Sequence, residues 1–82
     1  MINEILESAK QLVQYQMDTY PQPNYVAAKL GEEAGEVIRA YIHMAEGRGT
    51  HEMLVNEAIQ LIALTLRLVT EGDQTILHNL PD

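Results

Sequence analysis

The segment HEMLVNEAIQLIALTLRLVT, residues 51–70, decides the fold of this chain. Read as a helix, its apolar residues cover two sides. One side carries Val55, Ala58, Ile59, Ile62, Leu66 and Val69, and the other carries Leu54, Leu61, Leu64 and Leu68. A helix that is apolar on more than one side is surrounded by protein. We therefore expect a central helix over about residues 51–70, with Thr50 as its N-terminal cap and Gly72 as its end.

Two other segments are expected to form helices. Over about residues 3–17, apolar residues recur at intervals of three and four, which is typical of one apolar helix face. The same pattern covers about residues 25–46, with Asn24 suited to cap the start and Gly47 to stop the end. No alternation typical of strands appears. The sequence predicts an all-α fold, a helical hairpin with an additional N-terminal helix.

The segments between and after these helices are short. Residues 18–24 contain two prolines and several turn formers, a connection too short to divide the chain into domains. After Gly72, Asp73 is suited to cap a short turn that runs through Leu77. We predict that residues 1–82 form a single domain.

The size of the chain bears on its oligomeric state. A chain of 82 residues buries only about 60% of the surface of its unfolded form, so its own core is modest. Two flanking helices are too few to cover both apolar sides of residues 51–70. We therefore expect a four-helix-type bundle formed on homo-oligomerisation, as a homodimer or a dimer of dimers.

The composition excludes several classes of function. With 12 acidic and 5 basic residues the formal charge is −7, and no run of Lys or Arg exists to follow a phosphate backbone, so long nucleic acid is not an expected partner. The absence of cysteine excludes thiolate catalysis and cysteine-based zinc sites. The N-terminal residues do not resemble a signal peptide, and the apolar stretch at 61–69 is too short to span a bilayer. We expect a cytoplasmic protein without a membrane partner.

Acidic residues recur at helical spacing in two of the segments. Glu33 and Glu36 lie one turn apart on residues 25–46, and Glu57 and Gln60 repeat the spacing in a more apolar setting. Two antiparallel helices would bring three carboxylates and one amide oxygen around a single site. Carboxylates that lose water need a cation or a hydrogen-bonding partner, and oxygen ligands suit Mg²⁺ or Mn²⁺. In the alternative interpretation, Glu33 and Glu36 pair with neighbouring basic residues on a solvated face.

These residues also carry a family resemblance. The sequence KLGEEAGEVI at 29–38, followed by NEAIQLIAL at 56–64, resembles the MazG-type all-α nucleoside triphosphate pyrophosphohydrolases over roughly residues 26–70. That family is marked by Glu-x-x-Glu and a later Glu-x-x-Asp, which hold Mg²⁺. Glu33 and Glu36 match the first motif, and Glu57 matches the first residue of the second. Gln60 stands where the family usually has Asp, as in some short, phage-type members, and supplies an oxygen without a charge.

The resemblance implies a function for these positions. It implies a Mg²⁺-dependent hydrolase, a nucleotide pyrophosphatase that cleaves an NTP or dNTP between its α- and β-phosphates to give a monophosphate and pyrophosphate. Glu33, Glu36 and Glu57 would be catalytic and metal-binding, with Gln60 as a fourth metal ligand. The alternative function is a non-catalytic helical oligomeric module, for interaction or nucleotide sensing, that has lost turnover.

Other polar residues allow two interpretations each. Lys29 contacts a substrate phosphate or forms an i,i+4 ion pair with Glu33, and the ion pair is the more common arrangement. Arg39 and Arg67 share this ambiguity, and Arg67 has the further option of pairing with a carboxylate inside the bundle. The histidines have no close ligand spacing and are expected at the surface or at helix ends: His43, His51 and His78.

Tyrosines and glycines near the acidic motif are equally ambiguous. The four tyrosines either stack on a base or supply the aromatic packing of a chain that has no Phe or Trp: Tyr15, Tyr20, Tyr25 and Tyr41. Gly31 and Gly35 each cost about 1 kcal/mol relative to Ala inside a helix. Either they permit close approach by another backbone or a ligand, or they are merely tolerated.

Overall fold

A computed structural model describes residues 1–21 and 23–77 of the chain. It contains three long helices, α1 (Ile2–Thr19), α2 (Val26–Ala45) and α3 (His51–Glu71), and one short helix, α4 (Gln74–Leu77). The described residues contain no strand. The prediction of an all-α fold is confirmed, and the long helices begin and end within two residues of the predicted bounds. His78 lies outside the described residues.

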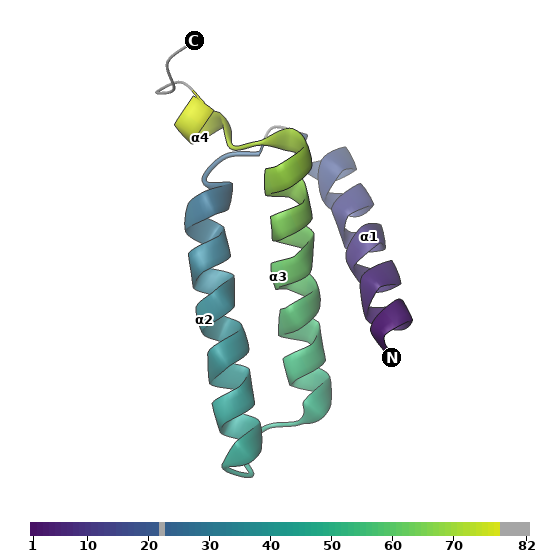
Figure 1. Ribbon diagram of the computed structural model, residues 1–82, viewed down its shortest axis with the longest axis vertical. Coiled ribbons are helices and arrows are strands. Elements are labelled where there is room, and N and C mark those ends of the chain that lie inside the picture. Colours follow the sequence, from purple (N-terminus) through teal and green to yellow (C-terminus); the bar gives the residue numbers. More distant parts are fainter. Residues whose placement is uncertain (22, 78–82) are drawn as a thin grey trace.

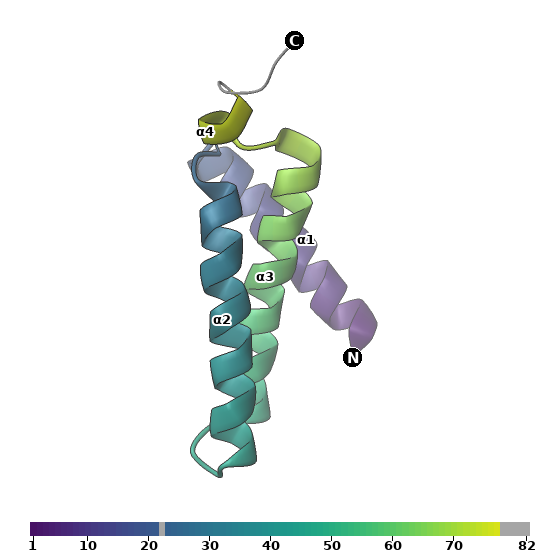
Figure 2. The same cartoon turned by 60° about the vertical axis from the view of Figure 1, so that its left-hand side comes forward.

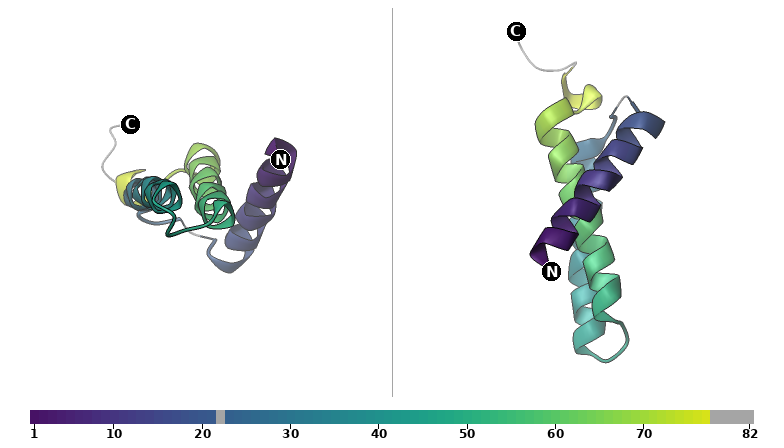
Figure 3. Two further views of the ribbon diagram at one scale, coloured as in Figure 1. Left: turned by 90° about the horizontal axis from the view of Figure 1, so that it is seen from below. Right: turned by 90° about the vertical axis from the view of Figure 1, so that its right-hand side faces the viewer.

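Helix α3 is the central element (Figure 1). It runs antiparallel to α2, with which it forms the predicted hairpin, and α1 packs on it from the other side. Figures 2 and 3 show that α1 crosses α3 obliquely, whereas α2 follows α3 along its length. In the described part of the chain, α1 and α2 do not contact each other. Every packing contact between long helices therefore involves α3.

The residues expected to cap or end the helices do so except at the start of α2. Thr50 caps α3, since its Oγ1 accepts a hydrogen bond of 3.2 Å from the amide of Met53. Gly72 ends α3 with a φ of +79°, a conformation that favours glycine. The prediction that Asn24 caps α2 is wrong: Tyr25 is the N-cap residue, in the left-handed region with a φ of 58°, and no local side chain caps the helix. The free amides at this end are instead bound by Asp73.

The core within one chain is thin. Among the described residues the buried apolar side chains are small or medium in size, Ala9, Pro23, Val26 and Ala63, and none of the large ones is fully buried. Exposed apolar residues continue along α2 and α3: Ile38, Tyr41, Ile42, Met53, Leu66 and Val69. The radius of gyration is 14.2 Å, against about 12 Å for a compact domain of this length. A single chain thus does not surround α3 as its sequence pattern requires.

Helix α3 is also long and apolar enough to cross a membrane, judged by length and composition alone. Only 11% of its most apolar window is buried inside the chain. The sequence-based expectation considered only the apolar stretch 61–69, which Thr65 and Arg67 interrupt and which is shorter than the helix. Core helices of soluble proteins pass the same criterion, so this finding shows only that α3 requires an apolar cover.

Candidate functional site

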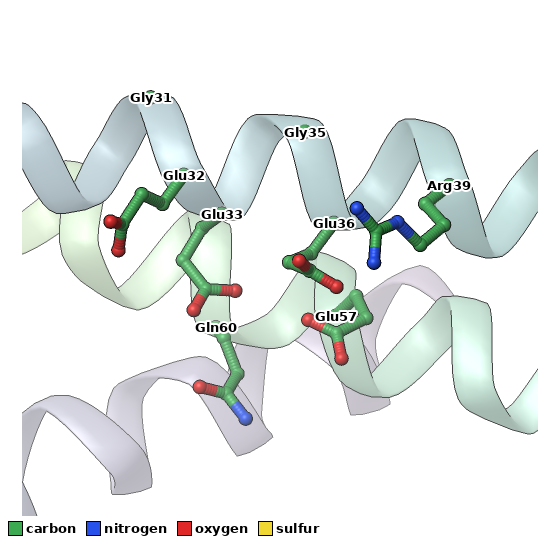
Figure 4. Close-up of a pocket in the computed structure, with 8 residues that line it drawn as sticks. All are labelled: Gly31, Glu32, Glu33, Gly35, Glu36, Arg39, Glu57 and Gln60. Atoms are coloured by element: carbon green, nitrogen blue, oxygen red, sulfur yellow. The ribbon is translucent and has the colours of Figure 1, made fainter.

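The four predicted metal-site residues line one open pocket of about 620 Å³ between α2 and α3. Figure 4 shows Glu33 and Glu36 extending from α2 toward α3, where Glu57 lies opposite Glu36, and the side chain of Gln60 begins next to Glu33 and extends away from α2. The hairpin explains this arrangement, because antiparallel helices place residues on either side of the turn next to each other. The pocket is completed by four residues of α2: Gly31, Glu32, Gly35 and Arg39. We call this site the acidic pocket.

Glu33 has the most perturbed environment in the acidic pocket. Its Oε2 atom is buried and has no hydrogen-bond partner among the residues that the structure describes. Burial raises the pKa of Glu33, and the neighbouring carboxyl group of Glu57 raises it further, as does repulsion from Glu36 and Glu32. The metal-free pocket therefore favours a proton, and a cation at the same place would relieve the same repulsion.

The residues of the acidic pocket offer the ligand atoms that Mg²⁺ prefers, but they do not enclose a binding site for it. All the facing groups supply oxygen ligands, which hard divalent cations prefer. However, among residues 1–21 and 23–77 no three acidic or histidine side chains form a ready-made metal cage. Mg²⁺ keeps several waters and usually binds through one or two carboxylates together with substrate phosphates. An open row of carboxylates suits that mode better than a structural ion.

The basic residues near the pocket lie in different settings. Neither Lys29 nor Arg39 forms a salt bridge in the described part of the chain, so the expected i,i+4 ion pair between Lys29 and Glu33 is absent. Arg39 lines the acidic pocket at one end. Arg67 is buried, with only 5% of its surface exposed, and forms the internal ion pair anticipated for it, with Glu71 at 2.5 Å. Lys29 and Arg39 remain available to an anion, and Arg67 does not.

A second groove of about 520 Å³ adjoins the acidic pocket, with which it shares Glu32, Glu33 and Gln60. We call it the tyrosine groove, because Tyr20 and Tyr25 line it, together with Lys29. Both tyrosines are 62% exposed. In this chain they are therefore not core packing, which leaves their rings accessible to a flat ligand.

Several lining residues escaped the sequence analysis. Glu32 lies one turn before Glu36, and that spacing was a usable signal. Gln16, from α1, lines the tyrosine groove, and its Oε1 atom is buried without a hydrogen-bond partner. No local pattern marks Gln16, because its place depends on how α1 crosses α3.

Gly31 and Gly35 border the acidic pocket, and a Cβ added at either meets no atom within 4 Å. No backbone of another element in the described part of the chain approaches them within that distance.

Comparison with protein-family models, with curated proteins and with solved structures finds no match for this chain.

Proposed function

We propose that this protein is a Mg²⁺-dependent nucleoside triphosphate pyrophosphohydrolase of the MazG type. The observation that carries the proposal is the meeting of Glu33, Glu36, Glu57 and Gln60 in one pocket, where a buried oxygen of Glu33 lacks a partner. Structural carboxylates are normally paired when buried. A row of unpaired acids is instead typical of sites that await a cation.

The proposed roles follow from position and charge. Glu33, Glu36 and Glu57 would hold Mg²⁺ or Mn²⁺, with the amide oxygen of Gln60 as a neutral ligand. The bound metal would neutralise the triphosphate and stabilise charge that develops during cleavage. The carboxylate of either Glu33 or Glu36 would orient or deprotonate the attacking water.

The groups around the acidic pocket would bind the remainder of the nucleotide. Arg39 at one end of the acidic pocket and Lys29 in the tyrosine groove form no ion pair within residues 1–21 and 23–77, and both cations are suited to phosphate. The tyrosine groove, which opens from the acidic pocket, would receive the nucleoside.

We further propose that the functional form is a homodimer or a dimer of dimers. The exposed apolar side chains of α2 and α3, which include Ile38, Ile42 and Val69, would pack against a second copy in a four-helix-type bundle. An obligate apolar interface of this kind resembles a domain core divided between subunits. The second copy would cover the apolar surface of α3, so that the oligomer would dissolve in water, as a cytoplasmic location requires.

The direct test is release of pyrophosphate from a panel of NTPs and dNTPs in Mg²⁺ or Mn²⁺. We expect turnover of at least one nucleotide, and Glu36→Gln should reduce it by about 100-fold, because the amide keeps an oxygen but loses the charge that attracts the metal. Circular dichroism should show unchanged helix content. The matched control is Glu7→Gln on the exposed surface of α1, which should retain full activity. Absence of pyrophosphate with every nucleotide, from folded protein, would exclude the proposed enzyme.

The second candidate is a nucleotide-sensing or interaction module without turnover. Gln60 favours it, because this position lacks the charge that the family's Asp supplies, and so does the absence of a ready-made metal cage in the described residues. Such a module would oligomerise without releasing pyrophosphate. A rise in melting temperature with Mg²⁺ and nucleotide, without hydrolysis, would identify a sensor, whereas no rise at all would identify a purely structural bundle.

A further inference from the structure

The carboxylate of Asp73 joins two parts of the chain that are far apart in sequence. It follows α3, yet its oxygens accept hydrogen bonds from the amides of Tyr25 at 3.1 Å and Ala27 at 2.9 Å, and also from the amide of Thr75 at 2.9 Å. The side chain is buried, with 4% of the residue exposed. Asp73 thus caps the start of α2 as well as the turn into α4.

Two neighbouring bonds extend this contact to Pro23 and Tyr20, in the connection between α1 and α2. The amide of Gln74 donates to the carbonyl of Pro23 at 2.9 Å. At the other end of the connection, Nη2 of Arg67 donates to the carbonyl of Tyr20 at 2.8 Å. We call this set of contacts, from Arg67, Asp73 and Gln74 to residues 20–27, the clasp. It holds the connection to the C-terminal end of α3.

The clasp fixes residues that form one wall of the tyrosine groove. Tyr20, Pro23 and Tyr25 all line that groove. Tyr25 adopts a left-handed conformation, which is uncommon for a residue other than glycine and persists only where the surroundings hold it. No side chain of α2 or of the preceding connection replaces Asp73 as a cap. The position of this wall therefore depends on the carboxylate of Asp73, which does not itself line the groove, with Thr75 Oγ1 as a second acceptor for the amide of Tyr25.

We propose that Asp73 is a positioning residue for nucleotide binding, acting through the clasp on the wall of the tyrosine groove. The inference rests on the proposed function. Asp73 is absent from the lining of both the groove and the acidic pocket, so its effect on the ligand is indirect. Loss of its carboxylate releases the amide of Ala27 and leaves the amide of Tyr25 with Thr75 Oγ1 alone, at 3.1 Å. The wall can then move, while Glu36 and Glu57, farther along the hairpin, keep their places.

The test is the Asp73→Ala variant, with KM and kcat measured for the nucleotide that the wild type hydrolyses fastest. We expect KM to rise about 5- to 10-fold, which corresponds to roughly 1 to 1.4 kcal/mol of lost binding, while kcat changes less than about 3-fold. An increase in KM at nearly constant kcat means loss of binding shared by ground state and transition state. Affinity for Mn²⁺ alone, measured by titration calorimetry, should stay unchanged.

Two further variants separate positioning from a loss of stability. Asp73→Asn keeps one acceptor oxygen and should recover part of the KM change. Asp18→Ala, at an exposed position of α1 outside both cavities, should leave both constants unchanged. A purely structural role would lower apparent kcat in proportion to the unfolded fraction and leave KM as it was, and that result would overturn the proposal.

A binding measurement distinguishes failure of this inference from failure of the proposed function. The probe is a non-hydrolysable α,β-methylene triphosphate in Mg²⁺, titrated into full-length protein. If the wild type binds it and Asp73→Ala binds it equally tightly, the positioning role is wrong and the proposed function stands. If the wild type neither binds the probe nor releases pyrophosphate, both proposals are wrong. Weaker binding by Asp73→Ala, with partial recovery in Asp73→Asn, supports the positioning role.

Discussion

Carboxylates are removed from water in two regions of this molecule, and the two regions treat them in opposite ways. In the clasp and beside it, Asp73 accepts three backbone hydrogen bonds, and Glu71 forms a two-pronged pair with the guanidinium of Arg67. In the acidic pocket, Glu33 has a buried oxygen without a partner and lies among other carboxylates. The same kind of group is thus fully bonded at one end of the hairpin and unpaired in its middle.

The two regions also differ in the direction of their pKa shifts. Backbone hydrogen bonds, that of Ala27 foremost, lower the pKa of Asp73, and the hydrogen bonds from Arg67 lower the pKa of Glu71. Burial raises the pKa of Glu33. Ionisation near neutral pH therefore stabilises the fold at the clasp and destabilises it in the metal-free acidic pocket. Charged groups that destabilise the ligand-free fold are typical of binding sites, because they are arranged to bind a ligand and not to stabilise the chain.

The largest predicted effect comes from breaking the bonded region. Arg67→Met removes a buried guanidinium and leaves Glu71 and the carbonyl of Tyr20 without their partner. Removing one member of a buried pair typically destabilises by about 3 kcal/mol or more. We expect that loss in the free energy of unfolding, measured by urea titration followed by circular dichroism.

The control for this variant is Arg39→Met. Arg39 is exposed and has no salt bridge in the described residues, so its loss should change stability by less than about 0.5 kcal/mol. Equal effects of the two substitutions would show that the ion pair of Arg67 does not distinguish this region from the pocket.

The next effect in size concerns the unpaired region. In the folded metal-free chain the pKa of Glu33 is raised above its ordinary value of 4.5, so the native state holds more protons than the unfolded state over the interval between these values. The free energy of unfolding contributed by Glu33 is therefore greatest at low pH and falls as pH rises through the folded pKa. Glu33→Gln removes this loss. We expect the variant to melt a few degrees above the wild type at pH 7.5 without metal.

Two measurements sharpen the comparison with the clasp. The difference in melting temperature between Glu33→Gln and wild type should shrink as pH falls toward 4.5, because the wild-type carboxyl then becomes protonated. With Mg²⁺ and the α,β-methylene triphosphate added, the order should reverse. A ligand at a hundredfold excess over its dissociation constant stabilises the wild type by about 2.7 kcal/mol, and the variant should lose most of that gain. A variant less stable than wild type at neutral pH without metal would contradict the account of Glu33.

The sequence predicted the helices and the acidic pocket because both depend on local periodicity. Glu33, Glu36, Glu57 and Gln60 lie at one-turn spacing on the two arms of a hairpin, and a hairpin with a short turn has few ways to fold. Thr50 as the cap of α3 is likewise local, and the structure confirms it.

The clasp was not predictable in this way. Asp73 was expected to begin the turn into α4, and it does so through the amide of Thr75. Its bonds to Tyr25 and Ala27 span 48 and 46 residues, and no periodicity connects those positions. Asn24 satisfies the local rule for a cap. The amides at the start of α2 are nevertheless bound by the carboxylate of Asp73, which follows α3.

The smallest predicted effect tests whether the open space in the acidic pocket serves a ligand. Beyond its own helix turn, a Cβ added at Gly35 meets no atom within 4 Å among the described residues, so Gly35→Ala should stabilise the metal-free protein by about 0.5–1 kcal/mol through helix propensity. We expect pyrophosphate release to fall in the same variant, because the methyl group would stand in the pocket that Gly35 lines. Ala28→Gly, at an exposed position of α2 outside the acidic pocket, should show the opposite change in stability and unaltered turnover. If Gly35→Ala gains stability and keeps full activity, Gly35 is merely tolerated in the helix and neither ligand nor partner approaches it closely.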